Sequence, residues 1–80
     1  MAFALHRWTR ETLLARLEAS DAIDDAAEVD VATAARDRLR LLGIGDRLEA
    51  HALTDDEAIA AFHSLRDEAH AVVPEQVRAD

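Results

Sequence analysis

Apolar residues recur along most of the chain at spacings of three and four, which is the period of an amphipathic α-helix. The clearest seam lies towards the C-terminus and consists of Ala58, Phe62, Leu65, Ala69 and Val72. No stretch alternates apolar and polar residues with period two, and helix breakers are limited to two glycines and one proline. The pattern therefore predicts an all-α fold, a compact bundle of three to four helices.

The first predicted helix begins after Thr9, which is a good N-cap residue. Trp8 is expected to pack on Leu13 as a hydrophobic staple at this start. The apolar stripe of the helix is then Leu13, Leu14 and Leu17. These leucines are expected to face the core.

The second predicted helix covers about residues 22–42, with a break near Asp30. Ser20 or Asp21 is expected to interrupt the first helix and to cap the second, because both are strong N-cap residues. Gly43 is expected to end the second helix in the left-handed conformation. Its inner face is predicted to comprise Ile23, Ala27, Val31, Ala34, Ala35, Leu39 and Leu42.

Two further capping signals follow. Asp46 with Glu49 predicts a short third helix, and Thr54 with Glu57 spells a capping box that begins the last helix. That helix is expected to run to about residue 73, where proline follows. The chain is accordingly interpreted as one helical domain over residues 1–80, with an apolar N-terminal segment at 1–8 and a frayed tail at 74–80.

The length and the net charge of the chain limit the classes of function that it can have. The chain has 80 residues and no cysteine, and its formal net charge is −8, from nine arginines, no lysine and 17 acids. Such a charge opposes direct binding of nucleic acid and favours a basic partner. No apolar run approaches the length of a membrane span, and the N-terminus does not resemble a signal peptide, so a cytoplasmic location is expected.

The acidic residues concentrate at Asp21, Asp24, Asp25 and Glu28. Placed in the first turn of the second predicted helix, they would be stabilised by its dipole and would form an exposed face. We interpret this face as a docking surface for a larger, basic protein. The predicted function is a non-enzymatic interaction module, such as an inhibitor or antitoxin-like protein, an adaptor or an accessory subunit. Mimicry of nucleic acid, adaptation to salt and simple solubility remain alternatives for the acidic face, and a homodimer is a further alternative for assembly.

Trp8 is the single tryptophan and follows an apolar terminal segment. One interpretation makes it an anchor that inserts into a groove of the partner. The other folds it back over the core of its own bundle. Both remain open at the level of sequence.

A metal site is the alternative function. His63, Asp67 and His70 recur at spacings of four and three, so they share one flank of the last predicted helix. A carboxylate and a histidine three residues apart recur in di-metal helical bundles, but those sites need further ligands from neighbouring helices. The bland interpretation is that the histidines are half-buried at the edge of the apolar face. No cofactor is expected.

The sequence argues against enzymatic activity and against DNA binding. Asp24, Asp25 and Glu28 spell a DDxxE pattern, yet the chain is too short for the helical cage of a magnesium–pyrophosphate enzyme. A helix-turn-helix interpretation of residues 39–46 fails because Asp46 and Glu49 would face phosphates. There is neither an activated nucleophile nor a phosphate-binding loop, so no enzymatic activity is expected.

Overall fold

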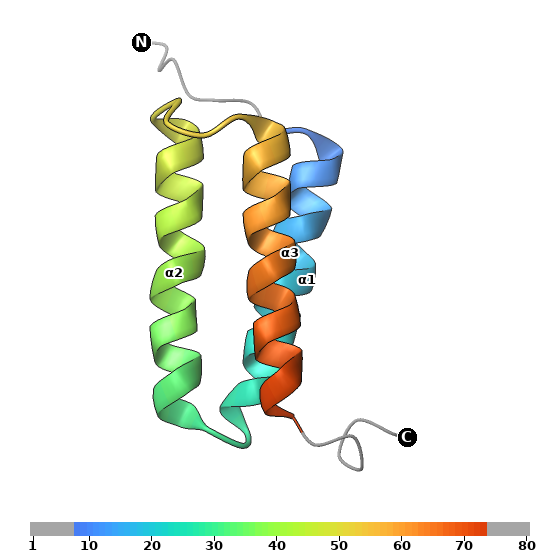
Figure 1. Ribbon diagram of the computed structural model, residues 1–80, viewed down its shortest axis with the longest axis vertical. Helices are drawn as coiled ribbons and strands as arrows, with labels where there is room; N and C mark the ends of the chain where they lie inside the picture. The colour runs from blue at the N-terminus through green and yellow to red at the C-terminus, as the bar shows by residue number, and fades with distance from the viewer. Residues whose placement is uncertain (1–7, 74–80) are drawn as a thin grey trace, which may run out of the picture.

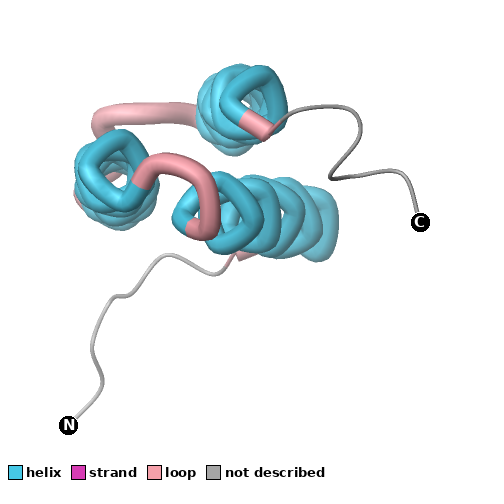
Figure 2. Tube along the Cα trace, turned by 90° about the horizontal axis from the view of Figure 1, so that it is seen from below, coloured by secondary structure: helices cyan, strands magenta, loops and turns pink. Residues whose placement is uncertain are grey.

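The computed structural model describes residues 8–73, which form three helices (Figure 1). Each helix runs antiparallel to the one before it in the chain, so the first and the third run parallel. They are α1 (Arg10–Ala27), α2 (Val31–Glu49) and α3 (Asp55–Val72). Seen from one end, they occupy the corners of a triangle (Figure 2). The predicted all-α bundle is confirmed, with three helices and no strand in this part of the chain. The expectations for residues 1–7 and 74–80 lie outside the described residues.

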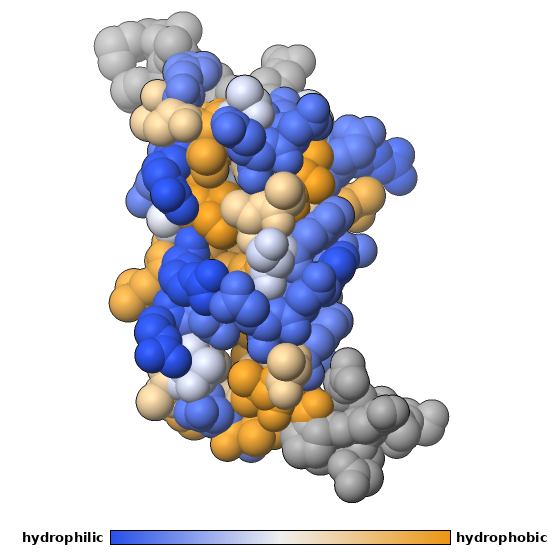
Figure 3. All heavy atoms as spheres, viewed as in Figure 1, coloured by the Kyte–Doolittle hydropathy of each residue, from blue (hydrophilic) through white to orange (hydrophobic). Residues whose placement is uncertain are grey.

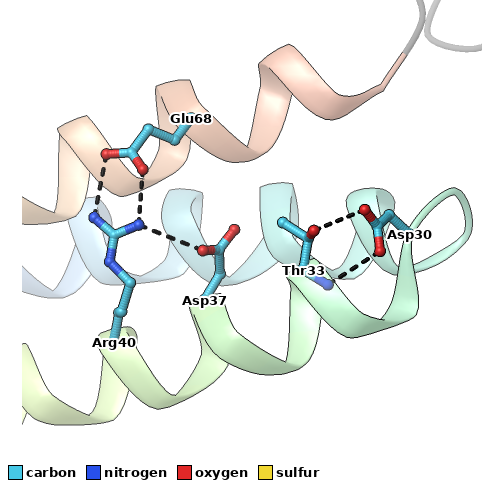
Figure 4. Close-up of polar contacts among 5 residues, drawn as sticks. All are labelled: Asp30, Thr33, Asp37, Arg40 and Glu68. Carbon is cyan, nitrogen blue, oxygen red and sulfur yellow. Dashed lines mark hydrogen bonds and ion pairs between the residues drawn. The ribbon is translucent and has the colours of Figure 1, made fainter.

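Each helix begins at a side chain that accepts a backbone N–H. Thr9 Oγ1 accepts from Thr12 N at 3.1 Å, and Thr54 forms the predicted capping box with Glu57, at 3.1 and 2.9 Å. Both predicted starts are confirmed. Asp30 caps α2 and accepts from the N–H and the hydroxyl of Thr33 at 3.1 and 2.7 Å, and these two bonds hold the pKa of Asp30 below its usual value (Figure 4).

The predicted interruption at Ser20 or Asp21 is wrong. Helix α1 continues to Ala27, and the chain turns only at residues 28–30. The break expected near Asp30 is therefore the boundary between α1 and α2. Good capping residues do not end a helix when the residues on either side bury one continuous face, because the packing of that face outweighs the alternative cap.

The predicted end at Gly43 and the new start at Asp46 are also wrong, because α2 passes through both to Glu49. Neither glycine has a positive φ. Packing explains the glycine at position 45, since a Cβ there would lie 3.3 Å from the Trp8 ring. A Cβ on Gly43 would meet nothing within 4 Å. The residue with left-handed backbone is His51 (φ 61°), just after the helix ends.

Helix α1 contributes mostly small residues to the core. Ala15, Ala19, Ala22 and Ala26 are buried on α1, and they allow that helix to approach α3 closely. Larger buried side chains come from all three helices: Phe62 and Leu65 of α3, Leu41, Ile44 and Leu48 of α2, and Ile23 of α1. The seam predicted for α3 is confirmed at Ala58, Phe62, Leu65 and Ala69, which are all buried.

The inner faces predicted for the first two helices are largely wrong. The predicted core leucines Leu13, Leu14 and Leu17 of α1 are exposed. Of the predicted face of residues 22–42, Ile23 and Ala34 are buried, Ala27 is half-buried, and the others lie outside: Val31, Ala35, Leu39 and Leu42.

The choice of face on α1 has a simple cause. The alanine side is free of charge along the whole helix, whereas the leucine side leads into Asp21 and Asp24. Burying the leucine side would also bury carboxylates, which is costly unless they are paired.

Polar contacts connect α2 and α3 on the face of the bundle that lies away from α1. Arg40 of α2 donates to both oxygens of Glu68 on α3, at 2.7 and 3.2 Å, and to the buried Asp37 at 3.4 Å (Figure 4). The bond from Arg40 lowers the pKa of Glu68 and in turn raises that of Arg40. Hydrophilic side chains accordingly cross the middle of this face (Figure 3).

Candidate functional site

Five leucines that the core does not use form an exposed apolar surface, called here the leucine face. Its members, with their exposed fractions, are Leu13 (45%), Leu14 (49%), Leu17 (55%), Leu39 (70%) and Leu42 (50%). Leu13 of α1 and Leu42 of α2 line the same hollow, which joins the two helices. Leu17 and Leu39 lie one turn further from each, in the same direction along the bundle, because α1 and α2 are antiparallel.

Burial of these leucines against a partner would contribute substantially to the free energy of binding. Complete burial of a leucine side chain is worth about 1.5–3 kcal/mol, so burying the exposed half of five leucines would contribute about 4–8 kcal/mol. Scattered exposed leucines need no explanation, but Leu13 and Leu42 meet across two neighbouring helices, which is typical of a contact surface.

Two hollows lie between α1 and α2, together called here the furrow, and Leu13 and Leu42 of the leucine face line one of them. Its upper part is a hollow of about 350 Å³ with Trp8, Arg16 and Gly45 among its lining residues. Its lower part is an apolar hollow of about 240 Å³, lined by Ile23, Ala27, Val31, Ala34, Ala35 and Arg38. Between the two, Arg38 crosses from α2 to α1, where it donates to Ser20 at 3.0 Å and pairs with Asp24.

Trp8 is half-buried at the upper end of the furrow. Its ring is tilted by 34° against Phe62, with 6.1 Å between the ring centroids, and the guanidinium of Arg16 lies 5.7 Å from the ring. Gly45 provides the close approach on the α2 side. Of the two interpretations of Trp8, the structure has the ring packed on its own bundle. The tryptophan forms part of the furrow and does not project from it.

The acidic residues follow the leucines along α1, and Asp21 among them lines the polar hollow between α1 and α3. Asp21, Asp24, Asp25 and Glu28, called here the acidic end, are all exposed. Asp24 pairs with Arg38, whereas the other three carboxylates make no ion pair with any residue in the range 8–73.

The position of these residues relative to the helix differs from the prediction. Because α1 continues to Ala27, the acidic end occupies its last two turns and not the first turn of a second helix. Carboxylates there face the negative end of the helix dipole, and α1 has no basic residue in its last turn to compensate. Pairs such as Asp21 with Asp25 also repel each other at i, i+4. The acidic end therefore costs stability.

The structure does not support the metal site. Within residues 8–73, no group of three or more histidine, aspartate or glutamate side chains could hold an ion. His63 instead points to Glu18, with Nε2 3.7 Å from Oε1, and Asp67 accepts from Arg66 Nε at 3.0 Å. His70 lines a shallow polar hollow between α1 and α3. The two histidines are half-buried at the edge of the core, as the bland interpretation has it.

Comparisons with protein-family models, curated proteins and solved structures give no match. No helix among the described residues is both long and apolar enough to cross a membrane. Any function must therefore be inferred from the surface itself.

Sequence reasoning found the acidic end but missed the leucine face. One signal was present in the chain. Leu14, Leu17, Asp21, Asp24 and Glu28 recur at spacings of three and four, so they form a single stripe on α1. A stripe that turns from leucine to carboxylate is a poor core face and a good contact surface.

Proposed function

We propose that this protein is a small acidic interaction module that binds a larger, basic protein through the leucine face and the acidic end. One observation carries the proposal. Asp21, Asp25 and Glu28 are exposed at the C-terminal end of α1, beyond its exposed leucines, and make no ion pair with any residue in the range 8–73. Apolar area supplies affinity, and the adjacent charge selects a cationic partner and speeds association.

The position of the acids argues against solubility as their only role. Acidic residues in the first turn of a helix are favoured by its dipole, and α3 has such a set in Asp55, Asp56 and Glu57. The acidic end of α1 contributes the same charge at a position where it opposes folding. Residues that cost stability without a structural return are typical of functional surfaces.

The module acts as an inhibitor, an adaptor or an accessory subunit, since its role is to occupy a basic surface. Binding would bring arginine or lysine side chains to the carboxylates of Asp21, Asp25 and Glu28. It would also remove the leucines from water. The electrostatic part of this affinity falls with added salt, whereas the apolar part does not.

Affinity purification from native cell extract tests the proposal. The protein captures its partner, and the variant Asp21→Arg, Asp25→Arg, Glu28→Arg should not. A matched control applies the same change in net charge at exposed acids away from the surface, as Glu11→Arg, Asp56→Arg, Asp67→Arg, and should retain capture. Equal capture by both variants would contradict the role assigned to the acidic end.

A further inference from the structure

A hollow between α2 and α3 shares no residue with the leucine face or the acidic end. It has a volume of about 310 Å³ and is lined by Arg40, Gly43, Ile44, Arg47, Ala61 and Ser64. The charged residues in this lining are two arginines, although the chain as a whole has a formal net charge of −8.

Helix α2 has the most basic composition of the three helices. It contains four arginines and three acids, whereas α1 contains two arginines and five acids, and α3 contains one arginine and five acids. At physiological salt the Debye length is about 8 Å, so carboxylates elsewhere on the surface are largely screened from the hollow. The local arginines therefore govern which ligand charge the hollow favours.

The two arginines of the hollow have different roles. Arg40 is held in position by both oxygens of Glu68 and by Asp37 (Figure 4). These three bonds leave two of the five N–H donors of its guanidinium. Arg47 is exposed and makes no ion pair with any residue in the range 8–73, so it supplies the net positive charge of the hollow.

Gly43 is an independent observation that points to a ligand. Its φ is not positive and a Cβ there would meet no atom within 4 Å, so neither the backbone nor the packing of the bundle requires glycine. Glycine within a helix costs stability relative to alanine. It lies between Arg40 and Arg47 on one stripe of α2, at spacings of three and four, where the lack of a side chain allows a ligand to approach the backbone closely.

We propose that this hollow binds a phosphate monoester, a small organic molecule with one terminal phosphate. The phosphate accepts hydrogen bonds from Arg47, from the remaining donors of Arg40 and from the hydroxyl of Ser64. A tetrahedral phosphate accepts in several directions, so donors on two helices can serve it together, and guanidinium groups match its geometry. The organic part contacts the apolar lining at Ile44 and Ala61. This site is separate from the surface of the proposed function.

Titration with defined anions tests the inference. Phenyl phosphate and inorganic phosphate are each added to the 15N-labelled protein, with sodium chloride at matched ionic strength as the control, and amide shifts are followed by NMR. We expect saturable shifts at Gly43, Arg47 and Ser64 with both phosphates, with phenyl phosphate binding about fivefold more tightly. Chloride should produce no saturable shift at these residues.

Three variants separate the site from the general effect of charge. Arg47→Gln should weaken binding of phenyl phosphate about tenfold, whereas Arg36→Gln, the same change in charge at an exposed position of α2 outside the lining, should change it less than twofold. Gly43→Leu keeps the charge but fills the hollow, and should also weaken binding about tenfold. Leucine is a better helix former than glycine, so α2 is retained, and circular dichroism checks this.

Equal weakening by Arg47→Gln and Arg36→Gln would overturn the inference, because the phosphate would then be an adventitious ion only. Absence of a saturable shift in the wild type would overturn it as well. Wild-type affinity in Gly43→Leu would show that the ligand lies outside the hollow. If Gly43→Leu does not fold, the comparison of the two arginine variants decides alone. None of these results depends on whether the protein captures a basic partner.

Discussion

Neutralising Asp25 and Glu28, as Asp25→Asn and Glu28→Gln, should raise the stability of this protein. Both residues lie at the C-terminal end of α1, where the helix dipole disfavours negative charge. Each also has an acid four residues earlier, Asp21 for Asp25 and Asp24 for Glu28. Neither carboxylate makes an ion pair with a residue of the described part, so its removal breaks no such contact.

The size of the effect follows from these two contributions. The dipole costs about 0.3–1 kcal/mol for each carboxylate, and each repulsive pair adds about 0.2–0.5 kcal/mol. The double substitution should therefore increase the free energy of unfolding by about 1–3 kcal/mol at low ionic strength. For a chain of this size, each kcal/mol raises Tm by about 4–8 °C.

Thermal unfolding followed by circular dichroism measures the effect. The gain should shrink in 1 M salt, where the Debye length falls to about 3 Å. A control substitutes acids in the first turn of α3, as Asp55→Asn and Asp56→Asn, and should lower Tm because the dipole favours negative charge there. An unchanged or lower Tm for the α1 variant at low salt would refute the claim that the acidic end costs stability.

Three further predictions concern the bundle itself. Gly43→Ala should stabilise the protein by about 1 kcal/mol, because the new Cβ meets no other atom within 4 Å. Gly45→Ala should stabilise it less and should shift the fluorescence emission of Trp8, because the new Cβ presses on the Trp8 ring. Tm and tryptophan fluorescence measure the two effects. Arg40→Ala should lower the free energy of unfolding by about 1–3 kcal/mol, because a buried carboxylate of α2 loses its partner. Arg40 lowers the pKa of Glu68 in the folded protein, so the stability from this ion pair is fully present above the pKa of an unfolded glutamate, about 4.3. That stability is lost as the pH falls through the lower pKa of Glu68 in the folded protein. Urea titrations should therefore show the stabilities of the wild type and the variant converging in acid. Leu17→Gln should change Tm by no more than a few degrees, unlike a core leucine, and a loss of folding would contradict the exposed position of that side chain.

Local signals predicted the helix starts well. Thr9, and Thr54 with Glu57, act within one turn of the chain, so the residues that form each cap are adjacent in sequence. The seam of α3 was also predictable, because its large apolar residues lie on one side only. These features depend on the period of the helix and not on its neighbours.

The remaining errors arose from packing between helices. Gly45 sits within α2 because the Trp8 ring packs against it, a contact between residues distant in sequence. On α1, alanines and leucines form two competing apolar sides, and size alone favoured the leucines. The buried side of α1 packs on α3, whose Phe62 is fully buried, and apart from Ile23 the buried apolar residues of α1 are all alanines.

The candidate site was predicted in composition but not in position. The acidic residues were identified from sequence, yet their effect on stability reversed sign once Asp25 proved to lie at the end of a helix and not at its start. The leucine face could not be predicted, because it consists of residues that the core leaves over. A surface of this kind becomes visible only when the buried side of each helix is known.

The most direct test of the docking surface is a map of the bound state. The 15N-labelled protein is titrated with the native partner captured from cell extract, and amide shifts are followed by NMR. We expect the perturbed residues to concentrate on α1 and α2, around Leu17, Glu28 and Leu42, with α3 residues such as Ala60 and Ser64 unaffected. Perturbations centred on the exposed side of α3, with the leucine face unchanged, would contradict it.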